Sequence, residues 1–238
     1  MIVPGSSGAM LHEGGSSVEG RLVTRDDTLV EVLTRDRLAS YERSAGRLAG
    51  ALRLYEWNMR AAAAVTELTG VVEVVARNVM DAELRSWAAS RRQRATWFDV
   101  APLDRPGRRD LAKARDRATR GGRRPEVHGR VLAELSFGFW RYLVESRYLT
   151  SLWTPALHRA FPCGPPDVLT RQRQVRARMQ QLHFVRNRAA HHEPVHQRDL
   201  HRDLDDALEL LGWIHPAAAE WAADVTSLRA VLDARPSG

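Results

Sequence analysis

The stretch RLAGALRLYEWNMRAAAAVTELTGVVEVVARNVMDAELRSWA, residues 47–88, decides the fold of this chain. Its apolar residues recur at spacings of three and four, which is the period of a helix with one buried face. Alanine, the strongest helix former, fills many of the other positions. We therefore predict a long helix here, with a kink expected at Gly70.

The pattern stays helical on both sides of this stretch, from about residue 36 onward. Prolines and glycines mark a connection at residues 98–108, and the residue before Pro194 must end a helix. No alternating strand pattern persists, so we predict an all-α bundle with a four-helix core plus additional helices. Further helices are expected over residues 108–119, 125–145, 167–193, 199–211 and 216–232. We expect residues 1–25, rich in glycine and serine, to be a disordered tail and residues 26–238 to form one domain.

Composition excludes several classes of protein. No apolar run approaches the roughly 20 residues that span a bilayer, and the N-terminus has no basic head followed by an apolar stretch. Cys163 is the single cysteine, which excludes an intrachain disulfide and a zinc site built from cysteines. We therefore expect a cytoplasmic protein without contact to a membrane.

Positive charge is concentrated in one segment. The chain carries a formal net charge of +7, and residues 91–124 hold twelve basic residues against four aspartates. Such a cluster is typical of a partner that is a polyanion, and equally of a solvated arginine-rich surface. Candidate contacts to nucleic acid are Arg115, Arg117 and Arg120 in this segment, together with Arg188 further on.

The second informative stretch is RNRAAHHEP, residues 186–194, at the predicted end of a helix. Asn187 and His191 are four apart, so the amide could orient the imidazole ring. Arg186 and His191 are five apart, about 140° around an ideal helix, and would not converge there. A shared site therefore needs a helix end that is distorted before Pro194, or a second subunit. A basic helix end whose side chains satisfy free carbonyls is the alternative.

Glu73 and Arg77 lie four apart within an apolar run and need partners if they are buried. Glu73 could hold Arg186 in place behind the site, or it could simply pair with Arg77. His191, His192 and His196 invite a metal site, but Pro194 interrupts the helix that would align them, so we predict no metal. We expect core positions rather than a surface for stacking bases at Phe137, Phe139, Trp140 and Tyr142.

Several segments resemble the Abi-like (abortive infection) proteins of the HEPN superfamily, over roughly residues 36–213. The Arg186-x4-His191 pattern resembles the RX4-6H signature of that superfamily. The other matching segments are LYEWN (54–58), EVVARN (73–78), LAELSFGFWRYL (132–143), SLW (151–153) and the full RNRAAHHEPV (186–195). The resemblance implies a helical bundle, often a homodimer with the two signatures facing each other. It also implies metal-independent cleavage of RNA, without a cofactor, in phage defence or a toxin–antitoxin system.

The resemblance also assigns roles to the residues of RNRAAHHEP. In RNA cleavage without a metal the ribose 2′-OH attacks its own phosphate; His191 would transfer the proton and Arg186 would stabilise the charged phosphate. Asn187 would orient His191 or bind a phosphate oxygen. His192 would be the second proton-transfer group, or a surface residue if that group is His191 of the partner subunit.

One departure from the family concerns regulation. Some HEPN toxins carry a regulatory tyrosine two residues after the histidine, where this chain has Glu193. Control through a tyrosine at that position is therefore excluded, and any antitoxin or defence partner is unidentified. The competing hypothesis is a non-catalytic HEPN-type module that binds nucleic acid or a protein through residues 91–124.

Overall fold

The structure is a computed structural model that describes residues 24–91 and 96–236. These residues form helices and no strand, which confirms the prediction of an all-α bundle. The α-helices are α1 (Arg25–Leu33), α2 (Arg35–Ala45), α3 (Leu48–Ser90), α4 (Trp97–Val100), α5 (Arg105–Thr119), α6 (His128–Glu134), α7 (Phe137–Leu143), α8 (Val168–Ala190), α9 (Leu200–Ile214), α10 (Pro216–Val225) and α11 (Leu228–Asp233). Three short helical turns follow α7: η1 (Ser146–Tyr148), η2 (Leu149–Trp153) and η3 (Leu157–Ala160).

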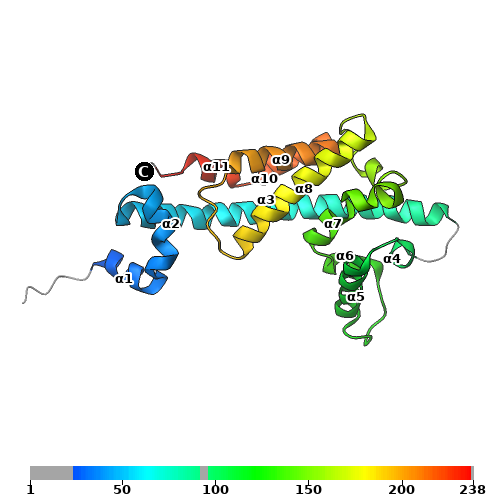
Figure 1. Ribbon diagram of the computed structural model, residues 1–238, viewed down its shortest axis with the longest axis horizontal. Helices are drawn as coiled ribbons and strands as arrows, with labels where there is room; N and C mark the ends of the chain where they lie inside the picture. Colours follow the sequence, from blue (N-terminus) through cyan, green and yellow to red (C-terminus); the bar gives the residue numbers. More distant parts are fainter. Residues whose placement is uncertain (1–23, 92–95, 237–238) are drawn as a thin grey trace, which may run out of the picture.

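The long helix α3 is the axis of the molecule, and the other helices lie along its two sides (Figure 1). It has 43 residues, and at 1.5 Å per residue it is about 65 Å long. We expected a kink at Gly70. The helix runs through this exposed residue without a break. Buried residues recur every three or four positions, for example Ala61, Val65, Leu68 and Val72. This spacing places the buried residues in one continuous stripe along α3, and later helices pack against that stripe.

Helix α8 crosses α3 obliquely, and α9, α10 and α11 lie together above α3 in this view, with α9 in contact with both α3 and α8 (Figure 1). The core stripe expected on α8 is confirmed, since Val175, Met179, Leu182, Val185 and Ala189 are all buried. Asp167 begins the helix by accepting a hydrogen bond from the backbone N–H of Thr170. The crossing brings the C-terminal end of α8 to the middle of α3.

Two helices that we expected to be single are each divided in two. The segment 125–145 forms α6 and α7, because Leu135 is extended and the Ser136 hydroxyl starts a new helix by accepting from the N–H of Phe139. The segment 216–232 forms α10 and α11, divided at Thr226, which is also extended. Of the aromatic residues of α7, Phe137, Phe139 and Trp140 are buried, as predicted for core positions.

Helices α4, α5 and α6 form a small unit against one side of α3, which we call the basic lobe (residues 96–134; Figure 1). A buried carboxylate attaches it: Asp81 of α3 accepts hydrogen bonds of 2.7 Å from Trp97 Nε1 and pairs at 2.7 Å with His128 Nε2. One acidic side chain therefore holds the first and the last helix of the lobe.

Candidate active site

Helix α8 stays regular to Ala190, where the N–H of His191 still donates to the carbonyl of Asn187, and a turn before Pro194 ends it. The N–H of Glu193 donates to the carbonyl of Arg188, and the N–H of His192 donates to the carbonyl of Ala189. These two bonds are the Schellman pattern, in which the residue after the cap is left-handed. That residue is His192, with φ 56°, a conformation that glycine adopts far more easily. The chain therefore turns sharply at His192.

Arg186 lies beside Glu73 of α3, and both side chains are partly buried. Burial raises the pKa of Glu73, while the positive charges of Arg186 and then Arg77 oppose the rise. The backbone N–H of Phe137, at the start of α7, also opposes the rise in the pKa of Glu73. The Glu73 carboxyl therefore feels the charges of Arg186 and Arg77 together, and neither of the two alternatives is singled out.

Asn187 contacts a different histidine from the one expected. Its Oδ1 accepts from Arg186 Nη1 at 3.3 Å, and its Nδ2 lies 3.3 Å from His183 Nε2. Helical side chains lean toward the N-terminus of their helix, so Asn187 reaches back one turn to His183 rather than forward to His191. The expectation that Asn187 orients His191 is wrong for this conformation. The bond also leaves Nε2 of His183 as the acceptor and the proton on Nδ1.

His183 is the histidine that sequence reasoning missed. Burial lowers its pKa, and the nearby charges of Arg141 and Arg186 lower it further, so that its neutral form is favoured. The backbone of α7 closes over it: a Cβ at Gly138 would lie only 3.0 Å from His183 Nε2. A signal was present in the sequence, because His183 and Asn187 are four apart, but the resemblance drew attention to His191.

A surface pocket of about 450 Å³ opens beside this cluster. We call it the α8 pocket; its lining residues are Arg141, Gln180, Gln181, His183, Phe184 and Asn187. The pocket joins α7 to α8 and therefore places a guanidinium, an imidazole and three amides around one hollow.

His191 and His192 are exposed and lie beyond the last turn of α8. His192 lines a second pocket, of about 390 Å³, together with Arg37 and Tyr55. A guanidinium N–H of Arg37 donates to the His192 carbonyl, which ties the turn to α2. The structure therefore brings Arg186 and Asn187 together and directs His192 to a different hollow.

Arg188 stabilises the turn that ends α8. Its Nη2 donates to the carbonyl of Pro194 at 2.7 Å, and its Nη1 lies 3.2 Å from Glu193 Oε2. Its guanidinium is thereby engaged within the chain, although it is still partly exposed.

Asn58, in the LYEWN segment, is a second residue whose role the sequence did not show. Its buried Oδ1 accepts from the N–H of Val195 at 2.7 Å and from the N–H of His196 at 3.0 Å. A lone amide on the apolar face of a helix needs such partners. Asn58 therefore fixes to α3 the segment that follows the His191–Pro194 turn.

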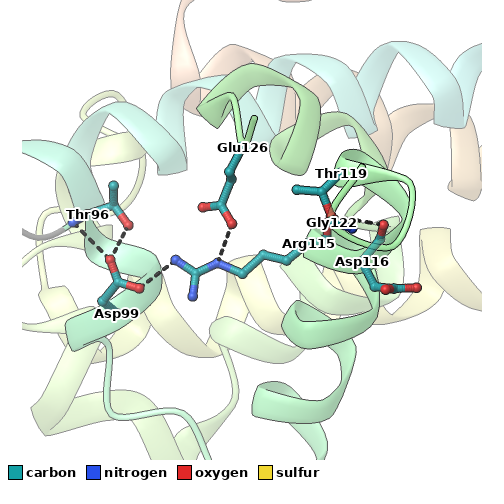
Figure 2. Close-up of polar contacts among 7 residues, drawn as sticks. All are labelled: Thr96, Asp99, Arg115, Asp116, Thr119, Gly122 and Glu126. Atoms are coloured by element: carbon teal, nitrogen blue, oxygen red, sulfur yellow. Dashed lines mark hydrogen bonds and ion pairs between the residues drawn. The ribbon is translucent and has the colours of Figure 1, made fainter. Parts of the chain in front are cut away.

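The candidate nucleic-acid contacts of the basic lobe differ in how far neighbouring carboxylates compensate their charge. Figure 2 shows Arg115 lying between Asp99 and Glu126, with ion pairs to both. Arg117 pairs with Glu134 at 2.7 Å. These two arginines connect α5 to the segments on either side of it, so much of their charge is compensated within the lobe.

Other basic side chains of the lobe are open to solvent. Arg120 is exposed at the end of α5, where it is left-handed with φ 53°. Further exposed cations are Arg105, Arg108, Arg109, Lys113 and Arg123. Arg92 and Arg94 belong to the same basic segment of the sequence, but they lie outside the described residues.

Over residues 24–91 and 96–236, none of the helices combines the length and the apolar character that crossing a membrane requires. Within the same residues, no group of three or more histidine, cysteine or acidic side chains is placed to hold a metal ion.

Comparison of the chain with protein family models, with curated proteins and with solved structures found no match.

Proposed function

We propose that this protein is a metal-independent endoribonuclease of the HEPN type, related to the Abi-like proteins and acting in phage defence or a toxin–antitoxin system. The observation that carries the proposal is the meeting of three separate segments at one place. The helices that carry EVVARN (α3), SFGFW (α7) and RNRAAHHEP (α8) contact one another, and the charge of Arg186 and the N–H of Phe137 both act on the Glu73 carboxyl. A chance basic string at a helix end would need no such support from two other helices.

The proposed chemistry uses the ribose 2′-OH as the nucleophile. It attacks the adjacent phosphorus, the bond to the 5′ oxygen breaks, and a 2′,3′-cyclic phosphate and a 5′-OH are formed. Arg186 stabilises the extra negative charge on the phosphate, while Glu73 holds the guanidinium in position. His191 takes or returns the proton. Asn187 holds Arg186 Nη1, and the second proton-transfer group is His192 or His191 of the partner subunit.

A homodimer belongs to the same proposal, because Arg186 is partly buried against α3 while His191 is exposed beyond the helix end. One side of α3 next to this end offers a surface for a second copy. Exposed and uncharged residues follow each other there at helical spacing: Met59, Ala63, Thr66, Gly70 and Val74. Light scattering at micromolar concentration tests the dimer, and a monomer would count against a site shared by two chains.

The cleavage test uses purified protein and mixed RNA in EDTA. Wild type should produce fragments with 2′,3′-cyclic ends, and His191→Ala should lose this activity. His201→Ala, an exposed histidine on α9, is the matched control and should cleave as the wild type does. Absence of cleavage by the wild type, or equal cleavage by His191→Ala, would refute the nuclease and leave the non-catalytic binding module.

RNA as the partner and the cytoplasm as the location follow from the same proposal. The exposed cations of the basic lobe would track the phosphate backbone, and charge reversal at Arg109, Lys113 and Arg120 should weaken RNA binding. The slope of log K against log salt should also decrease, by roughly 0.7 for each lost contact to a single strand. An unchanged slope would show that the lobe does not touch RNA.

A further inference from the structure

Phe184 is a large aromatic side chain left on the surface at the rim of the α8 pocket. Its side chain is 49% exposed, whereas Phe137, Phe139 and Trp140 of α7 are buried. The guanidinium carbons of Arg198 and Arg188 lie 5.2 and 5.7 Å from the centre of its ring. The two guanidinium groups therefore pack near the ring, and about half of the Phe184 side chain stays open to solvent.

Amide side chains surround this ring on the surface of α8. Gln180 and Gln181 lie one turn before Phe184, and Asn187 lies one turn after it, so all four share one side of the helix. Arg198 Nη2 donates to Gln181 Oε1 at 3.0 Å, which leaves the amide N–H groups of Gln181 to bind other partners. Both glutamines are exposed.

An exposed ring flanked by amides has the chemistry that recognises a nucleobase. Bases that are not paired stack on aromatic side chains, and amides match the donors and acceptors of their edges. The pocket volume of about 450 Å³ lies in the range of sites for small ligands. At the Asn187 end of the pocket stands Arg186, which would meet a phosphate.

We propose that the α8 pocket binds one unpaired nucleotide of a single strand, with its base stacked on Phe184 and its phosphate at the Arg186–Asn187 end. The inference rests on the proposed function and narrows its substrate to single-stranded RNA. A base within a duplex is already stacked on both faces and cannot reach the ring.

Binding is measured by fluorescence anisotropy with a labelled eight-nucleotide RNA that carries 2′-O-methyl groups. Without a free 2′-OH this RNA cannot be cleaved, so binding is separated from activity. A second RNA has the same backbone with abasic sugars, and a third is the duplex. The variants are Phe184→Ala and Phe184→Trp, and the matched control is Trp221→Ala, an aromatic residue of α10 that is 52% exposed.

Phe184→Ala should weaken binding of the base-containing single strand about 5- to 100-fold, the effect of losing one base–aromatic stack. The same variant should bind the abasic strand and the duplex as the wild type does. Phe184→Trp should retain affinity, and Trp221→Ala should change nothing. Three results would overturn the inference: an equal loss of affinity for the base-containing and abasic strands, no loss for either strand, or no binding by the wild type. If Phe184→Ala binds RNA as the wild type does, the exposed ring would instead contact a protein.

The two proposals can fail separately. Wild type that cleaves unmodified RNA while Phe184→Ala binds normally refutes the nucleotide pocket alone. Binding that depends on Phe184 without any cleavage refutes the nuclease alone. Because Phe184 is half-exposed, its alanine variant should keep the melting temperature of the wild type, which excludes unfolding as the cause of a loss.

Discussion

The end of α8 and the basic lobe are both rich in arginine, but their arginines serve different purposes. In the lobe, Arg115 and Arg117 pair with carboxylates of neighbouring segments. At the end of α8, Arg186 donates to the neutral amide of Asn187, and the carboxylate near it has a raised pKa. Positive charge is thus compensated in the region where it is densest in sequence. This difference shows that the number of arginines in a stretch of sequence does not measure the positive charge that is available to a ligand.

The largest effect should separate the two regions directly. Arg186→Ala should lower the rate of RNA cleavage by about 100-fold or more, the usual loss when a group that stabilises a transition state is removed. Arg115→Ala, also a partly buried arginine, should cleave at nearly the wild-type rate. Cleavage rates in EDTA check both variants at equal folded concentration. A large loss in Arg115→Ala with none in Arg186→Ala would reverse the comparison.

The attachment of the lobe should break on removal of one buried carboxylate. Asp81→Ala leaves the buried Trp97 Nε1 and the partly exposed His128 Nε2 without their partner, and an unpaired buried donor costs about 1 to 3 kcal/mol. We expect the free energy of unfolding to fall by about 2 to 4 kcal/mol. Urea denaturation followed by tryptophan fluorescence measures it.

The control for this variant is Asp116→Ala, an exposed aspartate of the same lobe, which should change stability by less than about 0.5 kcal/mol. If the two aspartates gave equal effects, the buried pairing would not be what holds the lobe.

The sequence predicted the helices well and the contacts of the site poorly, for one physical reason. Helical periodicity is local, so α3 and the buried stripe of α8 could be read from spacing alone. The division at Ser136 is also local, but a single serine hydroxyl competes with an otherwise continuous helical pattern.

Contacts between distant segments leave no such trace in one sequence. The pairing of Asn58 with Val195 joins positions that are 137 residues apart, and the approach of Glu73 to Arg186 also joins distant segments. The contact from Asn187 to His183 was within reach at a spacing of four, but the direction in which the side chain leans decided between two histidines.

A third test concerns acid stability at the junction of the lobe with α7. Burial alone would raise the pKa of Asp104, but hydrogen bonds from Tyr142, the Gly107 N–H and Arg147 lower it to about 2. A carboxyl whose pKa is depressed by folding stabilises the fold above its unfolded pKa, and this stability is lost as the pH falls through the folded value. Asp104→Asn should therefore melt below the wild type at neutral pH, and the gap should close between about pH 4 and pH 2.

Melting curves at successive pH values give the gap between the wild type and Asp104→Asn. A difference that does not depend on pH would assign the effect to lost hydrogen bonds with no contribution from the charge of Asp104. Since Asp104 is far in sequence from Arg186 and joins α5 to α7, cleavage at neutral pH should not change beyond the effect of stability.

The smallest effect compares the two regions at their helix ends. His192 after α8 and Arg120 after α5 are both left-handed residues with a side chain, at φ 56° and 53°. Replacing either by glycine should relieve strain, raising the free energy of unfolding by about 1 kcal/mol in each case. At saturating RNA, cleavage should stay at the wild-type rate in both variants, because Arg120 contributes only to binding and His192 faces the hollow with Arg37 rather than Arg186. A tenfold loss in His192→Gly alone would instead make His192 the second proton-transfer group, and would explain why strain is kept at that helix end.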